Sequence, residues 1–159
     1  EQNYGYSLPA KMREDLGYRV KSVSDHGHKE LSVREVCDVF EQTYMNRCTP
    51  LSVPEAHFTV RNNVFYAVVT VEMKGNSREV TSQGNGRLDA VCNAIHDATG
   101  LEFTLESYSE HSLDEGSTSR ACSYVGIRWP DGSMSWGAGT HTDIIMAGTR
   151  ALVSAVNNH

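Results

Sequence analysis

The chain has no excess of positive charge: 14 lysines and arginines stand against 20 aspartates and glutamates, giving a formal net charge of −6. A protein that binds nucleic acid usually presents a basic face, and no cluster of lysines and arginines stands out here. No apolar run approaches the roughly 20 residues that a membrane-spanning helix needs. We therefore expect no nucleic acid and no membrane among the partners of this protein.

The N-terminus lacks both an initiator methionine and a secretion signal. We therefore expect a piece of a longer protein that works in the cytoplasm. The cysteines, Cys37, Cys48, Cys92 and Cys122, have no C-x-x-C spacing. Cys37 and Cys92 fall on apolar faces of expected helices, where a reduced cysteine acts as a small hydrophobe. Reduced thiols agree with the cytoplasmic location.

Residues 1–54 are expected to form a helical subdomain. Pro9 stands near the start of a helix over 8–25, where its missing N–H costs little. A second helix follows Ser32 and Glu35, which form the Ser-x-x-Glu pattern of a capping box. After these helices, the stretch NRCTPLSVP predicts a linker, because its two prolines stop any helix.

From residue 56 the pattern changes, and the remaining chain repeats itself. Residues 64–73 are rich in valine and aromatic residues and predict a strand, and alternating apolar residues predict further strands over 101–107 and 121–129. Each copy ends in Gly-x-Gly and an amphipathic helix. The sequence predicts an α+β fold in which an internally duplicated β-β-β-α domain, 55–159, packs helices on antiparallel sheets. The two repeats cover about 55–100 and 101–159.

The glycine pairs, Gly84 with Gly86 and Gly137 with Gly139, allow three interpretations. A dinucleotide site would need a third glycine, and a Walker loop would need Gly-Lys-Ser/Thr; both are absent. The glycines are also consistent with tight strand-to-helix turns that need a positive φ. The third interpretation is a carboxylate site, because exposed amides at a helix start bind anions.

Two polar segments contain residue types that occur in metal or catalytic sites. His26 and His28 form a His-x-His pair, which ligates metal only with further ligands held rigidly; a solvated inter-helix loop is favoured. The stretch 108–121 contains Tyr108, acidic residues and a histidine, but no motif places a nucleophile beside them. We interpret it as a polar loop between strands, and the sequence presents no catalytic constellation.

Several motifs resemble the C-terminal regulatory domain of the 2-isopropylmalate synthase family, which citramalate synthases share. These are Gly-Asn-Gly at 84–86 before a helix, a strand with a tyrosine at 108, Trp-Gly-x-Gly at 136–139, and Ser-Ala-x-Asn at 154–157. Residues 4–25 are similar to the helical linker subdomain that precedes this domain in the longer enzymes. The resemblance covers nearly the whole chain.

The resemblance implies a parent enzyme that condenses acetyl-CoA with 2-oxoisovalerate in leucine biosynthesis. In the family this chemistry belongs to a TIM barrel that binds a divalent metal, and no barrel residues are present here. The resemblance therefore implies a chain with no catalytic residues, no metal, no cofactor and no activity of its own. It also implies three partners: leucine as feedback inhibitor, a second copy in a homodimer, and the catalytic barrel of the same chain.

An effector pocket follows from the same resemblance, built from the glycine motifs and the strands between them. Helix-start amides suit the leucine carboxylate, and an apolar wall suits its branched side chain. The implied residues are Asn85, Gly86, Leu88, Tyr108, Ser112, Ser119, Ala121, Gly139 and Ile144. Alternative functions are an isoleucine-binding domain of a citramalate synthase-type relative, a purely structural dimerisation module, and a standalone enzyme or nucleotide binder.

Overall fold

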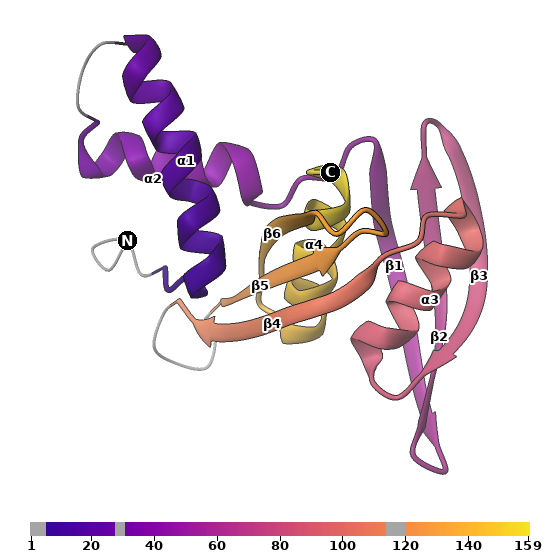
Figure 1. Ribbon diagram of the computed structural model, residues 1–159. Coiled ribbons are helices and arrows are strands. Elements are labelled where there is room, and N and C mark those ends of the chain that lie inside the picture. The colour runs from indigo at the N-terminus through magenta and orange to yellow at the C-terminus, as the bar shows by residue number, and fades with distance from the viewer. Residues whose placement is uncertain (1–5, 28–30, 114–119) are drawn as a thin grey trace.

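The computed structural model describes residues 6–27, 31–113 and 120–159 (Figure 1). Two helices are followed by two copies of a unit with three strands and one helix, which confirms the predicted α+β class. The elements are α1 (Ala10–Gly27), α2 (Val33–Tyr44), β1 (Leu51–Arg61), β2 (Val64–Met73), β3 (Asn76–Gly84), α3 (Arg87–Thr99), β4 (Thr104–Ser112), β5 (Ala121–Arg128), β6 (Met134–His141) and α4 (Ile144–Asn157).

Each repeat forms its own antiparallel meander, with the strand orders β1-β2-β3 and β4-β5-β6. Helix α3 packs on β2 and β3, whereas α4 packs on β5 and β6 and also touches β1 of the first sheet. One hydrophobic cluster contains residues of both sheets and both helices, among them Val69, Val91, Val125 and Leu152. The duplicated units therefore share a single core.

The α1–α2 pair covers the other face of the second sheet (Figure 1). Met12 and Phe40 of the helices pack in one cluster with Cys122, Tyr124 and residues of β6. As a result β5 is buried on both faces from residue 122 to 127, and the alternation expected for this strand is wrong. The helical pair covers one face of β5 and α4 covers the other, which explains the mostly apolar composition of this stretch.

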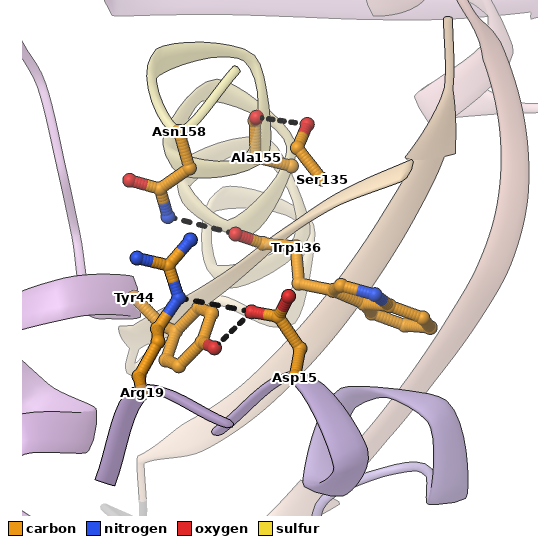
Figure 2. A network of polar contacts seen from close by, with 7 residues as sticks. All are labelled: Asp15, Arg19, Tyr44, Ser135, Trp136, Ala155 and Asn158. Carbon is orange, nitrogen blue, oxygen red and sulfur yellow. Dashed lines mark hydrogen bonds and ion pairs between the residues drawn. The ribbon is translucent and has the colours of Figure 1, made fainter. Parts of the chain in front are cut away.

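Polar contacts join α1 to α2 and α4 to β6 (Figure 2). The Asp15 carboxylate accepts hydrogen bonds from Tyr44 Oη and, at 3.0 Å, from Arg19 Nε. Close to this pair of contacts, Asn158 Nδ2 donates to the Trp136 carbonyl at 2.8 Å. The capping box predicted at the start of α2 is confirmed.

Element boundaries differ from the expectation in three places. Helix α1 continues to Gly27, beyond the predicted break at 26. The linker expectation is wrong from Leu51 on, because β1 begins there. Pro54 is accommodated in this strand where the pairing register shifts between Ser52 and Glu55. A proline cannot donate to the ladder, so a bulge in an edge strand is one of the few sheet positions that tolerates it.

Strand β4 starts later and ends later than the sequence indicated. It runs from Thr104 to Ser112 and pairs along β5. Tyr108 therefore lies in a strand, as the family resemblance implies, and the polar-loop interpretation of this part of the segment is wrong. The exposed edge of this strand allows polar side chains at alternate positions, which is why the segment resembled a loop.

The two glycine pairs are not equivalent. Gly84 ends β3 and Gly86 precedes α3, but Gly137 and Gly139 lie inside β6. None of these four has a positive φ, so that part of the expectation is wrong for both pairs. Residues 84–86 do form a short turn from β3 into α3, whereas the second pair forms no turn. In β6 the glycines instead permit close approach: a Cβ on Gly137 would lie 2.2 Å from the Ala155 nitrogen.

No helix within the described ranges is both long enough and apolar enough to span a membrane. In the same ranges, no group of three or more His, Cys, Asp or Glu side chains is placed to hold a metal ion. His28 and the side chain of His26 lie outside the described residues, so the His-x-His interpretation stays a prediction.

Candidate functional site

A cavity of about 370 Å³ lies where the starts of α3 and α4 approach β4. The two helix starts supply polar backbone and aliphatic side chains, and β4 supplies a tyrosine, a glutamate and a leucine. The lining includes Gly86, Leu88, Leu105, Tyr108, Glu110, Ile144, Ile145 and Gly148. The cavity therefore combines a helix terminus, an apolar wall, one arginine and two carboxylates, those of Asp89 and Glu110.

The two helices begin in different ways. The α4 start is capped by Asp143, whose side chain accepts a hydrogen bond from the Ile145 nitrogen at 2.9 Å. Gly86 occupies the same position before α3 in an extended conformation and makes no side-chain cap bond. A helix start has N–H groups without intrahelical partners and a partial positive charge. Of the two helix starts, α3 is thus the one without a side-chain cap.

Opposite charges flank the α3 start. Arg87 is the first helical residue, and its guanidinium lies 5.1 Å from the centre of the Phe65 ring. The exposed Asp89 carboxylate lies two residues later, in the first turn of α3, where its negative charge interacts favourably with the helix dipole. Because both side chains are exposed and line the cavity, an incoming anion meets the Arg87 charge as well as that of Asp89.

Tyr108 and Glu110 form the polar side of the cavity. Tyr108 Oη donates a hydrogen bond to Glu110 Oε2. Partial burial and this bond raise the pKa of Tyr108 to about 12, so its hydroxyl remains protonated at neutral pH. A Cβ on Gly148 would lie 3.3 Å from that hydroxyl, and the glycine therefore lets the tyrosine ring lie against α4.

Ser123 lies on β5 opposite Glu110, with its hydroxyl fully buried. Its hydroxyl is near Tyr108 and acts to lower the pKa of that residue, against the larger effects of burial and of the bond to Glu110. Within the described residues Ser123 Oγ has no hydrogen-bond partner. A buried hydroxyl without a hydrogen-bond partner is costly and uncommon in folded proteins.

The cavity brings together four of the predicted residues: Gly86, Leu88, Tyr108 and Ile144. Asn85 instead lines a neighbouring groove on the far side of the glycine turn. Ser112 and Ala121 pair with one another at the end of β4 and the start of β5, and neither lines the cavity. Gly139 packs against α4, and Ser119 lies outside the described residues.

Sequence reasoning did not assign Leu105, Glu110, Asp143 or Gly148 to the effector pocket. Leu105 belongs to the alternating pattern of residues 101–107. Asp143 can be identified as a cap from its place before an amphipathic run. Gly148 has no local signal, because its role depends on a ring that comes from another element.

Comparison with known proteins places the chain among regulatory domains. The sequence model of the family described as "LeuA allosteric (dimerisation) domain" matches residues 30–159. A 2-isopropylmalate synthase of Desulfitobacterium hafniense (strain Y51) is 46% identical over 157 residues, covering 99% of this chain and 28% of that protein. The 2-isopropylmalate synthase of Helicobacter hepaticus is 41% identical over 166 residues, covering 98% and 29%. The chain thus spans less than a third of these relatives.

Proposed function

Since the chain belongs to the LeuA allosteric (dimerisation) domain family, we propose that it binds leucine as the feedback inhibitor of a 2-isopropylmalate synthase and forms a homodimer. The observation that carries the leucine proposal is the cavity between the uncapped α3 start and the Tyr108–Glu110 pair. It offers complementary groups to all three parts of a small apolar amino acid.

The carboxylate of leucine would accept hydrogen bonds from the first-turn amides of α3, helped by the helix dipole and Arg87. Its ammonium would donate to the Glu110 carboxylate and to Tyr108 Oη. The branched side chain would lie against Leu88, Leu105 and Ile144. Burying a side chain of this size contributes roughly 1.5–3 kcal/mol.

The condensation of acetyl-CoA with 2-oxoisovalerate would belong to the larger part of such a synthase, with its divalent metal. We propose no condensing activity for this chain alone. In the parent enzyme, the catalytic barrel of the same chain would be the partner that receives the inhibitory signal. A ligand that binds one of two conformations more tightly shifts the equilibrium towards it, which is how leucine would inhibit.

Leucine is expected to bind this domain and to raise its thermal stability. Two analogues test the two polar contacts: 4-methylpentanoate lacks the ammonium and 3-methylbutylamine lacks the carboxylate. Each loses a hydrogen-bonded charged group, so each should bind at least about tenfold more weakly in calorimetry. Stronger binding of isoleucine would favour a citramalate synthase-type parent. The absence of any leucine binding would leave a structural dimerisation module.

The homodimer is expected to persist at about 10 μM, in the range of ordinary dimer affinities. The family's description as a dimerisation domain supports this. The first sheet also leaves Val68 of its central strand 37% exposed, whereas the second sheet is covered on both faces. Sedimentation velocity measures the state directly, and a monomer at that concentration would contradict the proposal.

A further inference from the structure

A second groove, of about 260 Å³, lies on the flank of α4 that faces the start of β1. Its floor is buried and largely apolar, with Val53 from β1 and Val153 from α4. Its rim carries the exposed arginines Arg47 and Arg150. Thr149 is buried between this groove and the cavity beside Tyr108, so the two hollows lie on different sides of α4.

The internal duplication explains why a groove occurs at this place. The third, sixth, seventh and tenth residues of α4 line it, together with three consecutive residues, 52–54, of β1. The same four positions of α3 and residues 103–105 beside β4 line another groove, of about 550 Å³. The crossing of a helix with the first strand of the other repeat thus produces a hollow twice.

The chemistry of the two grooves differs. Position seven of the helix is Arg150 in α4 but Asn93 in α3, and position three is Met146 in α4 but Asp89 in α3. The α4 groove therefore combines positive charge with an apolar floor, whereas its counterpart carries a carboxylate and amides. Of these two grooves, only the α4 groove should therefore prefer an anion.

The two arginines keep most of their hydrogen-bonding capacity free for a ligand. Arg47 Nη1 donates to the Gln42 carbonyl at 3.2 Å, and Arg150 Nη1 donates to the Thr140 carbonyl at 2.9 Å. Asn46, the residue before Arg47, donates from Nδ2 to Thr140 Oγ1 at 3.1 Å. Thr140 therefore contacts both Asn46 and Arg150, which brings the Arg150 head group close to the segment that contains Arg47. No carboxylate in the described part of the chain forms an ion pair with either arginine.

We propose that this groove is a second ligand site, which binds a small organic carboxylate with a short apolar tail. The carboxylate accepts hydrogen bonds from the two guanidinium groups, each of which presents five N–H donors in a planar fork. The tail lies on the floor made by Val53 and Val153. Since the whole chain has a net charge of −6, the attraction is local to this rim and does not follow from the overall charge.

Isobutyrate is the probe for this site, with isobutyramide as its uncharged counterpart and inorganic phosphate as the anion without a tail. Titrations followed by amide chemical shifts should show isobutyrate perturbing Val53 and Val153 and binding at least about tenfold more tightly than either control compound. Arg150→Gln should weaken isobutyrate binding about tenfold, as expected for loss of a charged hydrogen-bond donor. Arg47→Gln should act in the same direction.

Arg78→Gln is the matched control, because Arg78 is an exposed arginine of the first repeat that also donates to a backbone carbonyl, that of Asp97. It should leave isobutyrate binding unchanged. The proposal is overturned if isobutyramide or phosphate binds as tightly as isobutyrate, if neither arginine variant of the groove weakens binding while both stay folded, or if the shifts gather around Tyr108. Leucine binding at the cavity beside Tyr108 should be unchanged in Arg150→Gln, so the experiment tests the two proposed sites independently.

Discussion

Replacing Gly139 by alanine is expected to destabilise the fold by about 3 kcal/mol or more, although the change adds only one methyl group. A Cβ at this position would lie 2.4 Å from the Ala147 carbonyl oxygen and 2.5 Å from the Ala151 nitrogen. Both are backbone atoms of α4 and cannot turn aside as a flexible side chain does. The helix must move away from β6, and the shared core loses its contacts. Urea unfolding followed by circular dichroism measures the loss.

Gly86→Ala is the matched control, since it belongs to the other glycine pair and adds the same methyl group. The atom nearest to a Cβ there is Asp89 Oδ2, at 3.8 Å, and the extended backbone of Gly86 suits any residue. We expect the free energy of unfolding to change by less than about 1 kcal/mol. Equal losses of unfolding free energy in both variants would show that the close approach of β6 and α4 is not what requires glycine at position 139.

Gly86→Asp is expected to weaken leucine binding about 100-fold while the domain stays folded. An aspartate at this extended position would cap α3 as Asp143 caps α4, by accepting a hydrogen bond from a first-turn amide. The leucine carboxylate would then lose amide donors and meet a like charge. Two hydrogen bonds to a charged group, at about 1.5 kcal/mol each, correspond to this factor. Calorimetry measures the affinity, and thermal unfolding checks the fold.

The mirrored change, Asp143→Gly, removes the cap of α4 and should cost about 1 kcal/mol of stability. It should leave leucine affinity nearly unchanged, because the proposed carboxylate contact is at α3. If Gly86→Asp binds leucine as tightly as the unmodified protein, the α3 start is not the carboxylate site. If Asp143→Gly is the variant that loses leucine, the ligand approaches α4 instead.

Local patterns were enough to predict the order and type of most elements. The valine-rich run 64–73 coincides with β2, and the Ser32–Glu35 pair caps α2. Both signals depend on residues close in sequence, on period-two alternation and on capping within one turn. The duplication was visible for the same reason, because each repeat carries its own strands, turns and amphipathic helix.

The sequence by itself therefore determined an α+β fold with two similar units, and the family resemblance implied four residues that line the same cavity. Only the tertiary structure decided that Gly139 serves packing whereas Gly86 lines that cavity, and that β5 is covered on both faces. These properties depend on which elements meet across the core. The first glycine of each pair, Gly84 or Gly137, permits a helix to approach a strand closely, but the second glycines differ: Gly86 precedes α3 without a side-chain cap, whereas Gly139 lies in β6 against α4. The same Gly-x-Gly sequence thus has different roles in the two repeats, because a local pattern does not specify contacts between distant segments.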